Sequence, residues 1–151
     1  MQNIIPHLFA YSLSYVLVTL VVVYILNFPG WLTESYDLVR EYYIKNGFKA
    51  FVLDWFLVAA YILIGSLLIK SFHKEKSHNY QKFAIVAGTS FFISFLFMIL
   101  FKTRNLLQNT FFSRWFHKVG TLAAVYDLII VSCVYFLYQK LLCKFQYHNL
   151  I

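Results

Sequence analysis

Two aspartates interrupt long apolar stretches of the sequence, and they are the side chains best placed to do chemistry. Asp54 lies near the beginning of the stretch 50–69, and Asp127 lies near the beginning of the stretch 122–142. Carboxyl groups inside membrane spans are rare, and they usually face a bundle interior or a water-filled cavity. Two such carboxyls at one depth predict a site that binds protons or cations.

Three other interpretations give the aspartates no ligand. Each carboxyl can be a hydrogen-bonded anchor that fixes helix packing, or it can reach toward the interface without any role. Each can also form an ion pair with an arginine expected near the same interface. Those arginines are Arg40, Arg104 and Arg114.

The residues at helical spacing around each aspartate favour an inward direction. Residues three or four apart share one face of a helix, and small residues on such a face let helices approach closely in lipid. The face of Asp54 holds Gly47, Ala50, Val58, Tyr61 and Gly65, and that of Asp127 holds Gly120, Ala123 or Ala124, Val131 and Tyr138. The hydroxyl groups expected to support the carboxyls across the bundle are those of Ser12, Tyr15, Thr19, Tyr61, Ser90 and Ser94.

The composition points to the membrane. Of the 151 residues, 61% are hydrophobic and only 13% are charged, against about 45–50% and about 25% in soluble domains. This balance excludes a soluble domain and a disordered chain. Crossing a bilayer takes about 20 apolar residues in a helix, and the stretches that qualify are 8–26, 50–69, 83–101 and 122–142. The sequence therefore predicts an all-α integral membrane protein with one four-span domain over residues 1–151.

The connections between the spans carry most of the polar residues. Segments 27–49 and 102–118 place aromatic and apolar residues at helical spacing among charged ones. This pattern predicts amphipathic helices that lie in the membrane interface. The 70–82 connection is short, polar and basic, and it shares its side of the membrane with both termini.

Positive charge is spread over both sides of the membrane. Lys and Arg are divided almost equally between them, so the charge rule for orientation has little to act on. The compact basic 70–82 loop gives a slight preference for cytosolic termini. The formal net charge of +7 predicts attraction to anionic lipid headgroups of the bilayer, and no nucleic-acid partner is expected.

The two halves of the chain align without a gap after a shift of 73 residues. The coincidences that matter are Lys45 with Lys118, Gly47 with Gly120 and Asp54 with Asp127. Internal similarity of this kind is typical of a duplicated unit. The pattern predicts a duplicated two-helix hairpin whose halves have the same orientation in the membrane, as in parallel-repeat transporters.

Motifs of the common enzyme classes are missing from the sequence. There is no His-Glu-x-x-His, no Gly-x-Ser-x-Gly and no phosphate-cradling glycine loop. Tyr126-Asp127 matches half of the intramembrane aspartyl protease signature, but the Gly-x-Gly-Asp half is absent. Cys133 and Cys143 lie too far apart on one predicted helix to form a disulfide. No enzymatic activity, cofactor or metal is therefore expected.

The segments 42–54 and 120–131 resemble small multispan membrane proteins of large nucleocytoplasmic DNA viruses. In those proteins, an aromatic-rich interfacial segment leads into a span that carries an early aspartate, the position that Asp54 and Asp127 hold here. The resemblance covers less than a third of the chain and implies a virion membrane or an internal membrane of the host cell. It implies no particular activity.

Two functions remain as expectations from the sequence. The first is a non-enzymatic structural, assembly or membrane-organising component that forms a homo-oligomer. The alternative is a small proton- or cation-conducting channel or transporter that uses Asp54 and Asp127.

Overall fold

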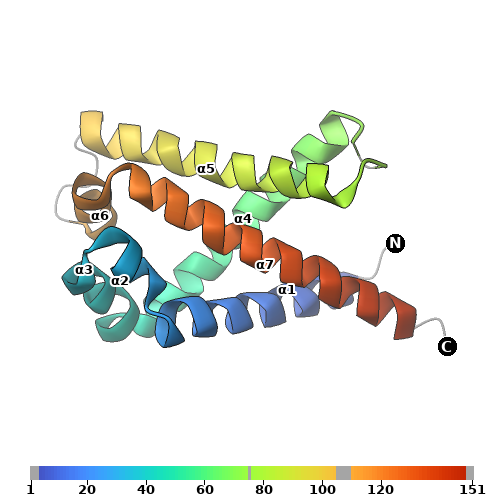
Figure 1. The fold of residues 1–151 in the computed structure, drawn as a ribbon, viewed down its shortest axis with the longest axis horizontal. Coiled ribbons are helices and arrows are strands. Elements are labelled where there is room, and N and C mark those ends of the chain that lie inside the picture. The colour runs from blue at the N-terminus through green and yellow to red at the C-terminus, as the bar shows by residue number, and fades with distance from the viewer. Residues whose placement is uncertain (1–3, 75, 105–109, 149–151) are drawn as a thin grey trace.

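The computed structural model describes residues 4–74, 76–104 and 110–148, which form helices and short connections without a strand. Within these residues, four long helices dominate (Figure 1). They are α1 (Ile4–Thr19) with its π-helical continuation η1 (Leu20–Ile25), α4 (Gly47–Ser71), α5 (Asn79–Arg104) and α7 (Thr121–His148). Each is long and apolar enough to cross a membrane. The predicted all-α, four-span fold is confirmed, and the chain is a multi-pass integral membrane protein.

Short helices gather at the end of the bundle where α4 and α7 begin (Figure 1). They are α2 (Phe28–Thr33), α3 (Tyr36–Arg40), the π-helical segment η2 (Glu41–Lys45) and α6 (Phe111–Val119). The chain turns into α2 at Asn27, whose backbone is left-handed with φ 47°. The helices bury one face and expose the other, since Val39 and Phe116 are buried while Arg40 and Lys118 are exposed. The amphipathic segments predicted in the connections 27–49 and 102–118 are therefore helical in their described parts, and residues 105–109 of the second lie outside the described residues.

The opposite end of the bundle carries the beginning of α1, the connection between α4 and α5, and the end of α7 (Figure 1). This arrangement matches the predicted division of the chain between two sides of a membrane. The short helices and the two termini consequently lie at opposite ends of the spans.

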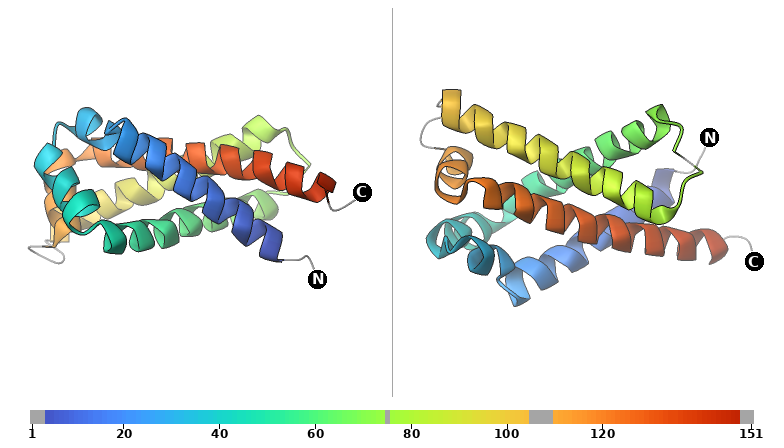
Figure 2. Two further views of the ribbon diagram at one scale, coloured as in Figure 1. Left: turned by 90° about the horizontal axis from the view of Figure 1, so that it is seen from below. Right: turned by 45° about the horizontal axis from the view of Figure 1, so that its top comes forward.

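Close backbone packing is uneven among the spans. α5 runs beside α7, α1 crosses α7, and α4 contacts α5 (Figure 2). At the α4–α5 contact Gly65 faces Val86, and a Cβ atom at position 65 would lie 2.9 Å from Val86 Cγ2 and 3.0 Å from its Cα. Only glycine allows this approach without a shift of the backbone.

Aromatic side chains fill the space between α1 and α4. The ring of Tyr11 meets that of Trp55 at a centroid distance of 5.3 Å, and the ring of Tyr15 meets that of Phe51 at 5.0 Å. Each tyrosine hydroxyl also donates a hydrogen bond to the backbone carbonyl of the same partner residue. Large side chains therefore connect α1 to α4.

The duplication stays a prediction. The shift of 73 residues places α1 and η1 on α5, η2 on α6, and α4 on α7. The packing inside the two halves differs, because α5 and α7 lie along each other whereas aromatic rings bridge α1 and α4.

Candidate functional site

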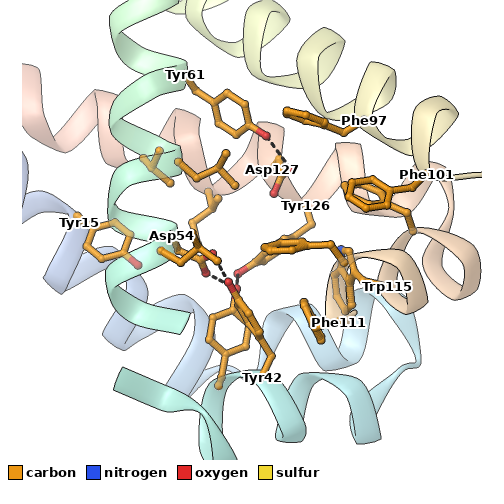
Figure 3. A pocket seen from close by; sticks show the side chains of 17 residues that line it. Tyr15, Tyr42, Asp54, Tyr61, Phe97, Phe101, Phe111, Trp115, Tyr126 and Asp127 are labelled. Atoms are coloured by element: carbon orange, nitrogen blue, oxygen red, sulfur yellow. Dashed lines mark hydrogen bonds between the residues drawn. The ribbon is translucent and has the colours of Figure 1, made fainter. Parts of the chain in front are cut away.

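Both aspartates border one cavity near the end of the bundle that carries the short helices (Figure 3). The cavity has a volume of about 220 Å³, and Asp54 and Asp127 are both partly buried residues. The walls come from α1, η2, α4, α5, α6 and α7. Their aromatic side chains are Tyr15, Tyr42, Tyr43, Tyr61, Phe97, Phe101, Phe111, Phe112, Trp115, Phe116 and Tyr126.

The small-residue faces predicted around the aspartates turn inward. Ala50, Val58 and Gly65 on α4 are buried, and so are Ala123 and Val131 on α7. Because these residues share helix faces with the aspartates, their burial directs both carboxyls into the bundle. The structure thus brings Asp54 and Asp127 to the same side of the molecule and to the same cavity.

Two tyrosines clamp the Asp54 carboxyl. Tyr42 Oη donates a hydrogen bond of 2.7 Å to Asp54 Oδ1, and Tyr43 Oη donates one of 3.0 Å to Oδ2. A third hydroxyl extends the network, since Tyr126 Oη lies 3.0 Å from Tyr43 Oη. Burial, together with the neighbouring Asp54 carboxylate, raises the pKa of the Tyr42 and Tyr43 hydroxyls above the usual range. Both therefore remain protonated and able to donate.

The local backbone explains how two consecutive tyrosines reach one carboxyl. Both belong to η2, where the backbone amide of Asn46 bonds the Glu41 carbonyl five residues earlier, at 3.2 Å. Single π-helical turns of this kind are frequent at functional sites. The hydroxyl of Tyr24, on the other π-helical segment, donates to the Tyr43 carbonyl at 3.1 Å. This bond holds η2 against the end of the first span.

Asp127 is held more loosely than Asp54. Tyr61 donates a hydrogen bond to it, with the hydroxyl 3.4 Å from Asp127 Oδ2. Ser94 of α5 is fully buried, and its hydroxyl has no hydrogen-bond partner in the described part of the chain. The shift of 73 residues places Trp115 and Phe116 where Asp54 has its two tyrosines, so the phenolic donors have no counterpart here.

Within the part of the chain that the structure describes, no basic side chain lines the cavity. Arg114 forms an ion pair with Glu41 on the outside of the short helices, with Nη1 2.9 Å from Oε2, and Arg40 is exposed. The alternative in which Arg114 neutralises an aspartate is therefore wrong, because its guanidinium is already paired at the surface. The side chain of Arg104 lies outside the described part of the structure.

The other hydroxyls proposed as supports have different partners or none. Ser12 accepts a bond from the Trp55 indole at 3.3 Å, and Ser90 donates to the Ala87 carbonyl at 2.8 Å. Tyr15 lines the cavity but donates to a backbone carbonyl. Thr19, like Ser94, is buried without a hydrogen-bond partner among the described residues. Of the proposed hydroxyls, Tyr61 is the one with a hydrogen bond to a carboxyl.

The tyrosines that hold Asp54 escaped sequence reasoning. Tyr42 and Tyr43 read as interfacial aromatics, since aromatic side chains are common at the membrane surface. Tyr126 stands directly before Asp127, and neighbouring residues on a helix point in different directions. The dipeptide Asn46-Gly47 could have indicated the change of chain direction between η2 and α4. This change of direction brings the two tyrosines onto the first turns of the next span.

Comparisons with protein-family models, curated proteins and solved structures give no match for this chain. Within the described residues, no group of three or more His, Cys, Asp or Glu side chains is arranged to hold a metal ion. The cavity and its two carboxyls are therefore the features of the molecule that indicate a function.

Proposed function

We propose that the protein is a non-enzymatic membrane carrier that takes up a proton or another cation at Asp54 and Asp127. One observation carries the proposal: the two carboxyls border one cavity inside the bundle, and among the described residues no Lys, Arg or His side chain borders it with them. The nearest polar groups are tyrosine hydroxyls, which bring no positive charge.

Electrostatics explains why this arrangement calls for a positive partner. A carboxylate removed from water loses hydration free energy, which a hydrogen bond from a neutral donor restores only in part. Two carboxylates in one apolar cavity also repel each other. A bound proton or cation removes both penalties, which is why ionisable residues inside membranes so often mark ion pathways.

The closed far side of the cavity favours a carrier over an open pore. Beyond Asp127, Val131 and Val134 of α7 are fully buried, and α4 meets α5 closely at Gly65. These contacts therefore close the bundle between the cavity and the end that carries the beginning of α1 and the end of α7. Movement of a cation across the membrane then requires a second conformation, as alternating access implies.

Ion flux into liposomes tests the proposal. Purified wild type, Asp54→Asn/Asp127→Asn and Asp37→Asn would be reconstituted at equal protein density, and proton and potassium flux measured at both membrane potentials. Asp37 is exposed and outside the cavity, so its variant matches the chemical change without touching the site. We expect ion flux in the wild type and in Asp37→Asn, and no flux in the double variant Asp54→Asn/Asp127→Asn. No flux above empty liposomes would refute transport.

A structural or assembly role is the second candidate, and the clamp on Asp54 favours it. The bonds from Tyr42 and Tyr43 attach η2 to α4, and the Glu41–Arg114 ion pair attaches η2 to α6. On this alternative, the protein organises a virion or internal host membrane as a homo-oligomer in contact with anionic headgroups. An amide retains much of the hydrogen bonding, so a scaffold would tolerate Asp→Asn whereas a proton carrier would not.

A further inference from the structure

We propose that the ligand of the cavity is an organic ammonium cation, which enters from the bilayer between α4 and α5. This inference rests on the proposed function, because it takes Asp54 and Asp127 as the cation-binding groups and adds the class of cation. Three features of the cavity point to this class of cation: the chemistry of the walls, the size of the cavity and the position of its opening.

The walls of the cavity suit an organic cation better than a metal ion. A hard cation such as Ca²⁺ takes six to eight oxygen ligands, whereas the carboxyls of Asp54 and Asp127 supply at most four. Most of the remaining wall is carbon, including the faces and edges of tyrosine, phenylalanine and tryptophan rings. Such rings attract ammonium groups through cation–π interactions, the means by which aromatic cages recognise quaternary ammonium.

The cavity is large enough for a cation with an apolar group attached. An apolar cavity of about 150 Å³ holds benzene, and this one has about 220 Å³. Tyr42 stacks on Phe111 at a centroid distance of 4.1 Å, and Phe111 stacks on Trp115 at 5.7 Å, which gives one continuous aromatic wall. The carboxyls lie deeper in the bundle, on α4 and α7 (Figure 3).

The opening of the cavity faces the lipid. Among the lining residues, Leu53 of α4 and Phe97 of α5 have the largest exposed fractions, 46% and 39%. α4 and α5 meet closely at Gly65 and diverge toward the end of the bundle with the short helices (Figures 1 and 2). An amphiphilic cation dissolved in the interface would therefore reach the carboxyls between two apolar side chains.

Isothermal titration of the protein in lipid nanodiscs tests the inference, with empty nanodiscs as the blank. The probes are benzyltrimethylammonium and neopentylbenzene, which has the same shape with carbon in place of the charged nitrogen. We expect saturable binding of the ammonium and at least tenfold weaker binding of the neutral isostere. Asp54→Asn/Asp127→Asn should lower the ammonium affinity at least tenfold, whereas Asp37→Asn should leave it unchanged.

A second variant and two further outcomes keep the test decisive. Trp115→Leu removes part of the aromatic wall and no charge, so it should weaken ammonium binding, and an unchanged ammonium affinity in this variant would overturn the inference. Equal affinity for the isostere would overturn the inference, because the cavity would then be only an apolar hole. Absence of ammonium binding, with proton flux still lost in Asp54→Asn/Asp127→Asn, would overturn it too and leave the proposed function intact.

Discussion

Replacement of Tyr42 by phenylalanine removes one hydroxyl and with it one hydrogen bond, the 2.7 Å contact with Asp54 Oδ1. A hydrogen bond to a charged group contributes about 1.5–3 kcal/mol to stability, against about 0.5–1.5 kcal/mol for a neutral pair. Because Tyr42 is buried, water replaces the lost donor poorly. At pH 8 we expect Tyr42→Phe to lower the free energy of unfolding by about 2 kcal/mol when Asp54 is a carboxylate.

The same substitution in an Asp54→Asn background should be milder. The amide oxygen still accepts a bond from Tyr42, but the bond is neutral, and its loss should lower the stability by about 1 kcal/mol. The two backgrounds therefore differ by a coupling free energy of about 1 kcal/mol, which a double-mutant cycle isolates. Unfolding by a denaturing detergent in mixed micelles, followed by circular dichroism, provides the four free energies.

Tyr24→Phe is the matched control. Its hydroxyl donates to the Tyr43 carbonyl at 3.1 Å, so its removal breaks a neutral bond near the same site. This control should lower the stability by about 1 kcal/mol or less, and equally in both backgrounds. If the effect of Tyr42→Phe were also the same with Asp54 and with Asn at that position, the reasoning about a charge-assisted clamp would be refuted.

Three further predictions concern the packing and the short helices. Gly65→Ala should lower the free energy of unfolding by about 1–3 kcal/mol through overpacking. Gly88→Ala is the control, because no atom lies within 4 Å of the new Cβ, and it should be neutral or stabilising by up to about 1 kcal/mol. Equal midpoints of the two variants in detergent unfolding would contradict this prediction. Gly120→Ala should lower the free energy of unfolding by about 1–3 kcal/mol, because φ is 62° at this position and a residue with a Cβ atom is strained there. An unfolding temperature equal to or higher than that of the wild type would show that the turn is not strained by the substitution. The hydrogen bond from Arg114 lowers the pKa of Glu41 in the folded protein. The ion pair therefore stabilises the fold at pH values above the ordinary carboxyl pKa of about 4.3. This stabilisation is lost as the pH falls through the lowered pKa of Glu41 in the folded state. Glu41→Gln should thus unfold slightly earlier than wild type at pH 7 and together with it at pH 3, a difference kept small by solvent screening; a gap that widens in acid would reverse the sign of the argument.

The spans were predictable because their physics is local. A helix in lipid needs only length and apolar side chains, and all four predicted stretches overlap long helices of the structure. The inward faces were equally readable, since the spacing of Ala50, Asp54 and Val58 marks one side of a helix whatever its neighbours are. The amphipathic segments followed from the same periodicity.

The partners of the carboxyls were not predictable because they depend on tertiary geometry. Tyr42 and Tyr43 contact Asp54 only because η2 turns back over the beginning of α4. Helical periodicity assumes regular α-helical turns and cannot anticipate a π-helical one. Ser12 and Ser90 showed the reverse error, since hydroxyls on inward stripes found a tryptophan and a backbone carbonyl instead.

The separation of the cavity from the termini turns a question of orientation into a simple accessibility experiment. α1 begins and α7 ends at one end of the bundle, and the cavity lies near the other (Figure 1). An epitope tag on either terminus is therefore remote from the cavity and leaves its opening free. Protease digestion of that tag in sealed vesicles reports the compartment of the termini, and the cavity lies toward the opposite compartment.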